Sequence, residues 1–563
     1  MDNVNEDKQK ELQDILRRVK ESSEERRAQD LAKTLNLSYT DLTQTSVVVD
    51  ALKLVPEEEA KEAQLAVIQS QGNKLAVLVY DPRLQKTKQT LDSLSQRGYK
   101  LNIFIVSPKT LDQAWSFYKL IAKHVAPISE KIEVEEGYFQ DLLNRLTNID
   151  AVKKEIENFD FKQFATARLV QIIIAGALAN RASDIHTEPQ ENSVTIRYRI
   201  DGILHDITKT LSPSVYDSFL TRIKLLSAMK LNIHDQTQDG RFTIVMPKKE
   251  VEMRVSIVPS EFGETIVMRV LDPDAIHIKL EDLGMRPDDF KIAIEKINQP
   301  NGLILNTGPT GSGKTTTLYA FLQAIATPDV KVITVEDPIE YRIAGIEQTQ
   351  VDEEAGYTFA NGLRAILRQD PDIILIGEIR DKETAEIALQ SALTGHIVFS
   401  TLHTNDSIGA VPRLMDLGIK PVILGPALSL VIAQRLVRKL CPYCKKPVEV
   451  SPELKSKIDK FIDNLPDRVD KNNYKNITLF DAVGCDKCNH TGFKGRIAIY
   501  EFFLGSRELE ELINKKDFSN VDLEELAKKQ GMVSLQQDGI LKAISGITTL
   551  KEVEEITGTL KWE

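Results

Sequence analysis

The segment of this sequence best suited to chemistry is Gly-Pro-Thr-Gly-Ser-Gly-Lys-Thr, from Gly308 to Thr315. Its glycines let the backbone curl, so that successive N–H groups can converge on an anion. Lys314 can supply a mobile charge to the outer phosphates of a nucleoside triphosphate, and Thr315 a hydroxyl to Mg²⁺. A glycine-rich turn that happens to contain Lys-Thr is the alternative, but the spacing and the flanking apolar segments favour a phosphate-binding loop. The expected nucleotide-binding residues are Gly308, Pro309, Thr310, Gly311, Ser312, Gly313, Lys314, Thr315 and Thr316.

Acidic side chains follow two neighbouring apolar segments. Lys331 to Val335 leads into Glu336 and Glu340, and Asp372 to Ile376 leads into Glu378. Ligands of an open parallel sheet lie beyond the carboxyl ends of its strands. A nucleotide hydrolase needs one acid to hold Mg²⁺, directly or through water, and another to orient the attacking water. We expect Glu378 in the first role and Glu336 or Glu340 in the second. Salt bridges at strand ends could explain one of these acids, but not all three.

Basic side chains could complete such a site. A third apolar segment is bracketed by histidines and ends at His403. Arg254 and Arg269 stand in segments otherwise rich in Val, Met and Ile, which are typical of strands. These two arginines can be solvated side chains on a strand face or cations poised for a phosphate. The residues alone leave both interpretations open.

The four cysteines form two Cys-x₂-Cys pairs, Cys441 with Cys444 and Cys485 with Cys488. Two such pairs are typical of a tetrahedral zinc site with four thiolate ligands. Four protein ligands leave no open position, so the zinc would be structural. A redox dithiol is the alternative, although one pair would suffice for it. His490 is close enough in sequence to compete as a ligand.

The elements that must position these residues follow from the alternation of apolar and polar segments. Alternating residues around Asp201-Gly202 predict a β-hairpin, and Leu12, Ile15, Leu16 and Val19 have helical spacing. We expect a charged helical arm (1–33), an α/β interaction domain (34–124), an acidic linker (125–160), an α+β domain (161–280), a nucleotide-binding core (281–440), a zinc-binding subdomain (441–500) and a helical C-terminal region (501–563).

Composition narrows the function classes. The 563 residues carry a formal net charge of -11, which argues against a protein that wraps nucleic acid. The N-terminus lacks the basic start and apolar core of a signal peptide. The most apolar long run, Val422 to Val437, contains Pro426, Gln434 and Arg435, so we expect a core helix there rather than a membrane span. We expect a cytoplasmic protein that reaches a membrane only through partners.

The motifs taken together resemble the secretion ATPases of type II secretion and type IV pilus assembly, over about Phe164 to Glu501. The resemblance rests on the phosphate-binding loop with Val335–Tyr341, Leu367–Ile374, Gly377–Asp381, Thr394–Asp406 and Ala433–Arg438, and on Arg181–His186 and the Asp201-Gly202 hairpin before them. It implies an α/β fold with a RecA-like P-loop ATPase core, a preceding PAS-like α+β domain, a small N-terminal α/β domain and a zinc-knuckle subdomain with four cysteine ligands. It also implies that Arg254 and Arg269 reach the nucleotide and that His403 belongs to a histidine box of the active site.

Members of this family work as cytoplasmic hexameric rings that use ATP, Mg²⁺ and, in some members, Zn²⁺. Hydrolysis rotates one domain against the other and turns an inner-membrane platform protein, which adds or removes pilin subunits. Retraction motors lack the long N-terminal region and the two cysteine pairs. The resemblance therefore implies a type IV pilus assembly ATPase, with a type II secretion or DNA-uptake pseudopilus ATPase as the alternative.

The resemblance extends to the N-terminal region, where Leu54 to Ala60 and the following strands look like the N-terminal domain of assembly motors. Some relatives bind cyclic di-GMP there through a glycine-containing leucine repeat. We find no such repeat between Lys8 and Leu37, so that ligand is not predicted. A nucleic-acid translocase would show basic or aromatic pore motifs, and a non-enzymatic scaffold would have lost Lys314 or the strand-end acids.

Overall fold

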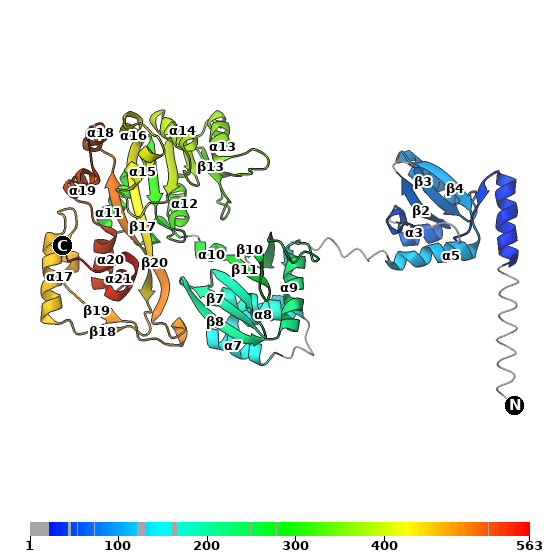
Figure 1. Cartoon of the computed structure of the whole chain (residues 1–563), viewed down its shortest axis with the longest axis horizontal. Coiled ribbons are helices and arrows are strands. Elements are labelled where there is room, and N and C mark those ends of the chain that lie inside the picture. The colour runs from blue at the N-terminus through cyan, green and yellow to red at the C-terminus, as the bar shows by residue number, and fades with distance from the viewer. Residues whose placement is uncertain are drawn as a thin grey trace. The chain divides into compact units, whose positions relative to one another are not determined.

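The computed structural model describes residues 22–42, 47–52, 54–71, 74–120, 131–133, 136–159, 166–247, 249–276, 278–515 and 517–562. The chain divides into two compact units, Met1–Ser129 and Glu130–Glu563 (Figure 1). The first described helix covers residues 22–35. The helical spacing predicted from Leu12, Ile15, Leu16 and Val19 lies outside the described residues.

The first unit contains a small α/β domain with a four-stranded sheet of order β1-β4-β3-β2. Strand β3 (Lys74–Val79) is parallel to β4 (Lys100–Ile105) and antiparallel to β2 (Leu65–Gln71). Helices α4 (Gln85–Gln96) and α5 (Pro108–Ser116) pack apolar side chains against the sheet in one core. The N-terminal α/β domain predicted from alternating strands and helices is confirmed. The smaller elements are β1 (Ser38–Tyr39), α2 (Val49–Leu52), α3 (Glu57–Glu62) and η1 (Phe117–Leu120).

The second unit begins with an α+β domain whose seven-stranded sheet has the order β5-β9-β10-β11-β6-β7-β8. Strands β7 (Val194–Ile200) and β8 (Ile203–Leu211) pair antiparallel around Asp201 and Gly202, whose φ angles are 51° and 91°. A tight type I′ hairpin turn requires positive φ at both central residues, so the predicted hairpin is confirmed. The other elements are β5 (Lys131–Glu133), α8 (Thr166–Ala179), β6 (Asp184–Pro189), α9 (Pro213–Leu226), β9 (Gln238–Met246), β10 (Lys249–Ser260), β11 (Gly263–Leu271) and α10 (Pro273–Ile276).

The segment 125–160, expected as a linker, differs from that expectation in its second half. Helices α6 (Glu136–Arg145) and α7 (Ile149–Glu157) bury Phe139, Leu142 and Val152 in the core of the α+β domain. Both helices are short and carry many charged residues on their exposed sides. Ile149, Val152 and Ile156 of α7 are spaced for one helix face, so an apolar period is present in this segment, although its acidic composition favours a linker.

The nucleotide core is built on a seven-stranded sheet of order β14-β13-β15-β16-β12-β17-β20. All neighbours are parallel except β17 and β20. Leu303 and Leu305 of β12 face one apolar core, and Ile304 faces another on the opposite side. A sheet covered on both faces explains why its strands have continuous apolar sequences. The strands are β12 (Gly302–Thr307), β13 (Val332–Glu336), β14 (Glu347–Gln350), β15 (Ile373–Ile376), β16 (Ile397–Leu402), β17 (Leu428–Leu440) and β20 (Phe493–Leu504).

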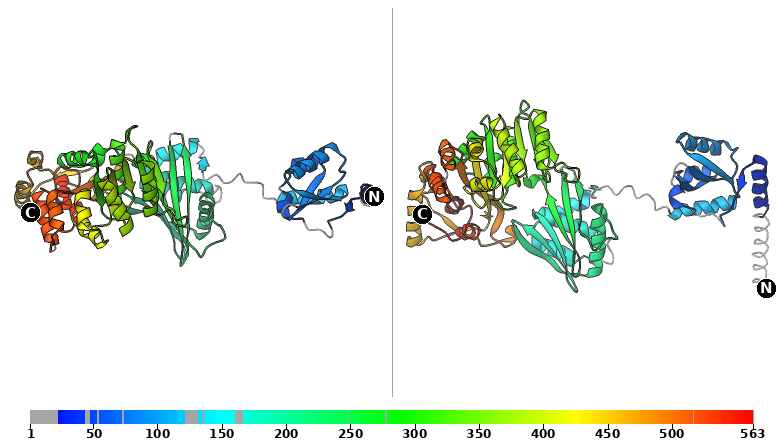
Figure 2. Two further views of the ribbon diagram at one scale, coloured as in Figure 1. Left: turned by 90° about the horizontal axis from the view of Figure 1, so that it is seen from above. Right: turned by 45° about the horizontal axis from the view of Figure 1, so that its top comes forward.

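Helices cover both faces of this sheet (Figures 1 and 2). Helices α11 and α12 contribute to the core on one face, and α13 to α16 to the core on the other. Their bounds are Pro287–Ile297 (α11), Lys314–Ile325 (α12), Phe359–Ile366 (α13), Lys382–Leu393 (α14), Ala410–Asp416 (α15) and Pro421–Ala427 (α16).

The core helix expected over Val422 to Val437 is wrong. The run splits at Leu428 into the end of α16 and the start of β17. Most residues of β17 are buried because its side chains enter the apolar cores on both faces of the sheet, Val431 on one face and Leu430 and Ile432 on the other. A strand buried on both faces has no period-2 alternation, so periodicity alone cannot distinguish it from a buried helix.

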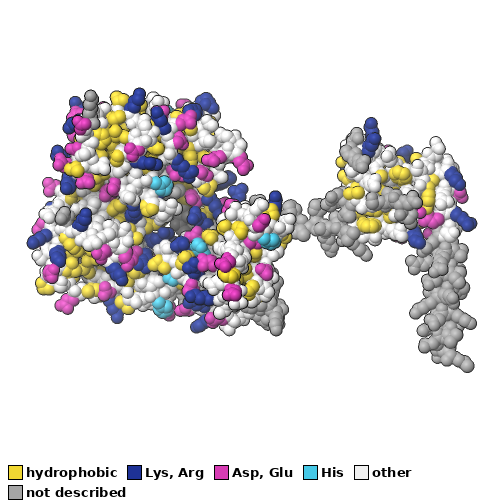
Figure 3. Space-filling view, viewed as in Figure 1, with side chains coloured by type: hydrophobic (Ala, Val, Ile, Leu, Met, Phe, Trp, Pro, Cys, Tyr) yellow, Lys and Arg dark blue, Asp and Glu magenta, His cyan; other side chains and the backbone are white. Residues whose placement is uncertain are grey.

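The region after β17 carries the cysteines and the C-terminal helices. The small sheet β18 (Lys446–Val448) and β19 (Leu479–Asp481) pairs beside α17 (Pro452–Asn464). Four helices follow β20: α18 (Arg507–Ile513), α19 (Asn520–Lys529), α20 (Leu535–Ile544) and α21 (Leu550–Thr557). Figure 3 shows acidic and basic side chains interspersed over the visible face of the second unit. Among the described residues, no helix has the length and apolar content needed to cross a bilayer.

Candidate active site and metal centre

The phosphate-binding loop connects β12, which ends at Thr307, to α12, which begins at Lys314. This is the strand–loop–helix context that such a loop requires. Gly308, Gly311 and Gly313 have φ angles of 151°, 79° and 91°, which other residues rarely adopt. A Cβ atom on Gly308 would lie 2.6 Å from the carbonyl oxygen of Gln434. Glycine is therefore required at the first position of the loop by both conformation and space.

The Lys314 side chain folds back over the loop. Its Nζ donates hydrogen bonds to the carbonyl oxygens of Gly308 (2.8 Å) and Pro309 (3.2 Å). Burial lowers the pKa of Lys314, the Glu378 carboxylate opposes this shift, and the positive charge of Arg435 adds to it. Both acceptors are neutral, so a phosphate would offer this ammonium a charged partner and a stronger hydrogen bond.

Glu378 and His403 lie together beyond the ends of the adjacent parallel strands β15 and β16. The Glu378 Oε1 atom accepts a hydrogen bond from Nη2 of Arg380 at 2.5 Å. Its Oε2 atom lies 3.4 Å from Nε2 of His403. The structure thus groups three of the predicted site residues, Lys314, Glu378 and His403, at the carboxyl edge of the sheet.

The two remaining acids have different surroundings. Glu336 is 3% exposed, and its carboxylate accepts hydrogen bonds from the hydroxyls of Tyr319 and Thr334 and from Nε2 of Gln348. Burial raises the pKa of Glu336, and these hydrogen bonds oppose the shift. The Glu340 side chain is 33% exposed, and its Oε2 atom lies 3.3 Å from Nη1 of Arg254. Of the two acids, Glu340 is the one with room to accept a hydrogen bond from water.

Arg254 and Arg269 are directly opposite each other on β10 and β11, but they have different partners. Arg254 reaches the nucleotide core, where it donates to the carbonyl oxygen of Ile339 as well as to Glu340. Arg269 stays within its own domain: its Nε lies 3.3 Å from Oδ1 of Asp184, and its side chain is 55% exposed. Of these two arginines, the structure therefore brings Arg254, but not Arg269, to a strand-end acid.

Two polar residues beside the loop were not predicted as site residues. Gln434 is buried, and its Oε1 atom accepts hydrogen bonds from Nδ2 of Asn306 (2.9 Å) and from the Thr317 hydroxyl (2.8 Å). It therefore ties β17 to the end of β12 and to the first turn of α12. Arg435 follows it and lies against Gly308. The sequence signal for both was their polarity within the apolar run Val422 to Val437.

A cavity of about 430 Å³ adjoins the helix side of the phosphate-binding loop. Gly313 and Thr316 line it from the loop and helix, and Asn180 and Arg181 line it from the α+β domain. This volume falls in the range of small-molecule sites.

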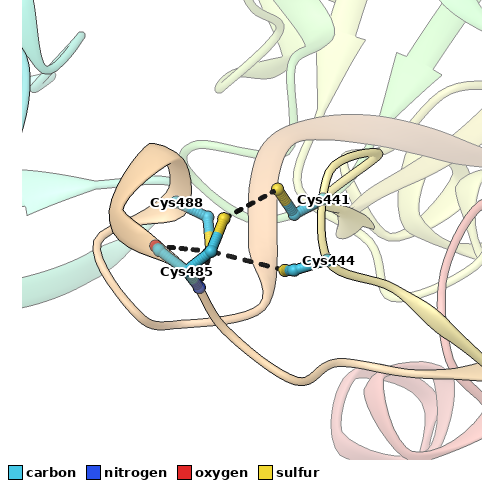
Figure 4. A group of neighbouring side chains, drawn as sticks. All are labelled: Cys441, Cys444, Cys485 and Cys488. Atoms are coloured by element: carbon cyan, nitrogen blue, oxygen red, sulfur yellow. Dashed lines mark hydrogen bonds between the residues drawn. The ribbon is translucent and has the colours of Figure 1, made fainter.

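The four cysteines converge in space, although the pairs are far apart in sequence (Figure 4). Their sulfur atoms all lie within 4.8 Å of one another, with Sγ–Sγ distances of 3.9 Å for Cys441–Cys485 and 3.8 Å for Cys444–Cys488. A tetrahedron with zinc–sulfur bonds of about 2.3 Å has edges of about 3.8 Å, so these residues fit Zn²⁺. Backbone N–H groups of Cys485 and Gly492 donate to the Cys488 sulfur, as is favourable for a thiolate. His490 is not part of this group; its Nε2 lies 3.2 Å from Oδ1 of Asp486.

Comparison with known proteins gives two matching family models. One, described as "Type II/IV secretion system protein", matches residues 162–555. The other, described as "MshEN domain", matches residues 35–120.

Curated proteins match over most of the chain. The type IV pilus assembly ATPase PilB of Myxococcus xanthus is 38% identical over 532 residues, which are 93% of this chain and 89% of that protein. The protein of the same name from Thermus thermophilus is 36% identical over 96% of this chain, which spans only 58% of that relative. The type II secretion system protein E of Aeromonas hydrophila is 43% identical over 390 residues, or 69% of this chain and 75% of that protein.

Solved structures give a fold likeness. The ATPase DotB of Legionella pneumophila matches with a TM-score of 0.52 and 22% identity, covering 71% of this chain and 97% of DotB. At this identity the likeness concerns the fold alone.

Proposed function

The chain belongs to the type II/IV secretion system protein family, and from this premise we propose that it is a motor ATPase that hydrolyses ATP to ADP and phosphate to drive type IV pilus assembly. The observation that carries the proposal is the grouping of Lys314, Glu378 and His403 beside an intact phosphate-binding loop. The Myxococcus xanthus relative, named as a pilus assembly ATPase, aligns with this chain nearly from end to end.

The roles in hydrolysis follow from the surroundings of each side chain. Lys314 holds the outer phosphates, and its neutral partners Gly308 and Pro309 give way to them. Thr315 and Glu378 would hold Mg²⁺, which would supply charge neutralisation at the phosphates. Glu340 orients the attacking water, because its carboxylate is accessible and Glu336 is already saturated with buried donors.

Movement would come from the contact between the α+β domain and the nucleotide core. Arg254 links the two at Glu340, so a change at the phosphates can be transmitted to the preceding domain. A cation that neutralises charge in the transition state accelerates such reactions strongly. We place Arg254 in this role, and Arg269 in a supporting role through Asp184. Closure of one domain on the other then couples hydrolysis to motion.

The family suggests the setting in which this motor works. We propose a homohexamer in the cytoplasm that reaches the inner membrane through a platform protein and other pilus or secretion components. Zn²⁺ held by Cys441, Cys444, Cys485 and Cys488 would stabilise the subdomain between β17 and β20. No nucleic-acid partner is proposed.

Type II secretion is the alternative function, and one observation favours it. Identity to the Aeromonas hydrophila type II secretion protein E is higher, at 43%, than identity to the pilus assembly relatives. That higher value applies to 69% of the chain, whereas the pilus assembly relatives align with more than nine-tenths of it. DNA-uptake pseudopilus assembly belongs to the same class of alternative.

The enzymatic part of the proposal is tested by phosphate release from ATP with Mg²⁺. Lys314→Ala and Glu378→Gln are expected to abolish turnover, whereas Lys455→Ala, an exposed lysine on α17, should retain it. Wild-type turnover in Lys314→Ala would refute the site. The cellular role is tested by complementing a deletion strain with wild type or Lys314→Ala. Loss of surface pili supports pilus assembly, and loss of secreted enzymes with normal pili supports the alternative.

A further inference from the structure

Arg435 belongs to a motif, Ala433–Arg438, that the proposed reaction leaves without a role. The parallel pairing of β12 with β17 ends at Thr307 opposite Ala433. Arg435 lies within β17, two residues beyond the segment that pairs with β12, at the level where β12 has turned into the phosphate-binding loop. Its position places a guanidinium at the carboxyl edge of the sheet, where ligands of parallel sheets bind.

The hydrogen-bond partners of Arg435 are unusual for a half-buried cation. Its Nη1 donates to the carbonyl oxygen of Gln434 at 3.0 Å, and its Nη2 donates to the carbonyl oxygen of Asn405 at 2.8 Å. Both partners are neutral, and no ion pair joins Arg435 to a carboxylate in the described part of the chain. Buried arginines are generally paired with anions. This one is placed to accept a further, anionic partner.

The guanidinium shares a residue with the lysine of the loop. A Cβ atom built on Gly308 would lie 3.0 Å from Nη1 of Arg435, so the guanidinium packs against Gly308. The carbonyl oxygen of the same glycine accepts the hydrogen bond from Lys314 at 2.8 Å. Two cations thus contact the first residue of the phosphate-binding loop.

A third polar group, the Ser312 hydroxyl, lies at the same point. The Cβ atom built on Gly308 would lie 2.7 Å from its oxygen. Ser312 is 4% exposed, and its hydroxyl makes no hydrogen bond to the described residues. A buried hydroxyl without a partner is costly. An oxyanion bound in the loop could satisfy it.

The electrostatics agree with this geometry. Burial lowers the pKa of Arg435, and the charges of Glu501 and Asp406 oppose this shift. The charge of Arg435 in turn contributes to the lowered pKa of Lys314, after the larger effect of burial. The two cations therefore repel each other in the nucleotide-free loop. An anion bound between them would relieve that repulsion.

We propose that Arg435 is a second cationic ligand of the nucleotide phosphates, exchanging the Asn405 carbonyl for a phosphate oxygen when the nucleotide binds. The inference rests on the proposed function, because it takes the nucleotide to lie in the loop from Gly308 to Thr315. It assigns to the motif Ala433–Arg438 within β17 a phosphate-binding role beside that of Lys314.

The test compares Arg435→Gln and Arg435→Lys with wild type and with Arg507→Gln, an exposed arginine on α18 whose loss should change nothing. Affinities for ATP and for inorganic tripolyphosphate are measured by calorimetry with Mg²⁺. Arg435→Gln should weaken both ligands about tenfold, the effect of losing one charge-assisted hydrogen bond, and Arg435→Lys should weaken them less. Because the contact is to phosphate, both ligands should be affected by the same factor.

Thermal unfolding separates binding from a structural role. Without nucleotide, the midpoint of Arg435→Gln should change little, because the loss of the hydrogen bond to Asn405 and of the favourable charges of Glu501 and Asp406 is offset by removal of the repulsion with Lys314. The rise in midpoint caused by ATP should become smaller, since it follows ligand affinity. A lowered midpoint without nucleotide, combined with an unchanged ATP-induced rise, would show that Arg435 acts only in the fold and overturn the inference.

Lys314→Ala distinguishes failure of the Arg435 inference from failure of the proposed function. If Lys314→Ala weakens ATP and tripolyphosphate but Arg435→Gln leaves both unchanged, Arg435 is not a phosphate ligand and the proposed function stands. Weakening of ATP without weakening of tripolyphosphate would place Arg435 at the nucleoside and also overturn the inference. If the wild-type protein binds neither ligand, the proposed function fails and the inference fails with it.

Discussion

The division of labour between Glu336 and Glu340 can be tested by the same chemical change at both positions. Glu340→Gln removes a charge that is 33% exposed and paired with Arg254 at 3.3 Å. Such exposed pairs contribute about 0–1 kcal/mol, which corresponds to at most about 4 °C in the unfolding midpoint of a domain this size. If Glu340 orients the attacking water, turnover should nevertheless fall by about 10²–10⁴-fold.

Glu336→Gln should behave in the opposite way. Glu336 is 3% exposed and accepts three hydrogen bonds, including one from Thr334 at 2.5 Å and one from Gln348 at 3.1 Å. An amide nitrogen cannot accept, so at least one buried donor loses its partner at a cost of about 1–3 kcal/mol. The unfolding midpoint should drop by roughly 2–12 °C, and turnover below that temperature should fall much less than in Glu340→Gln.

Both variants are measured for phosphate release at saturating ATP and for thermal unfolding. The reasoning is refuted if Glu336→Gln loses turnover at an unchanged midpoint while Glu340→Gln retains wild-type turnover. That result would show that the buried carboxylate changes its partners before reaction.

Three further outcomes are expected. Arg254→Ala should keep ATP binding but lower hydrolysis about a hundredfold, whereas Arg269→Ala, whose partner is Asp184, should lower it less; equal losses would contradict the different contacts of the two arginines. Elemental analysis should find one zinc per chain, and Cys488→Ser should lose it together with protease resistance in the β17–β20 region; a metal-free, fully folded protein would exclude the site. Lys224→Met should lower the free energy of unfolding by about 3–5 kcal/mol, because Lys224 and Glu264 form an ion pair of 2.6 Å at 1% and 3% exposure; Lys224→Met/Glu264→Leu should recover most of the loss, and failure to do so would assign the effect to packing.

The parts of the site that are local in sequence could be predicted from it. The loop from Gly308 to Thr315 needs only a strand before it and a helix after it, and both are adjacent in the chain. The zinc site could be predicted because two Cys-x₂-Cys pairs supply the four thiolates that a structural zinc ion binds. The hairpin at Asp201-Gly202 follows from backbone angles that those two residue types tolerate.

The parts that depend on sheet order could not be predicted in the same way. Gln434 and Arg435 reach the loop because β17 lies beside β12, more than a hundred residues away in sequence. Glu336 and Glu340 look equivalent in the sequence, and only burial separates them. Arg254 and Arg269 are opposite each other on adjacent strands, so their different partners depend on contacts with other elements.

The separation of the cysteine pairs has a consequence for the unfolded chain. Cys441 and Cys485 are 44 residues apart, as are Cys444 and Cys488, and they lie where β17 ends and β20 is about to begin. A cross-link closing a loop of this length lowers the entropy of the unfolded state by the equivalent of about 4 kcal/mol at 25 °C. An ion held by these thiolates therefore acts as a removable cross-link on a very long hairpin. Removal of the ion would first increase the mobility of the segment between β17 and β20. Because Gln434 of β17 pairs with Tyr500 of β20, that mobility would reach the strand that lies beside the phosphate-binding loop.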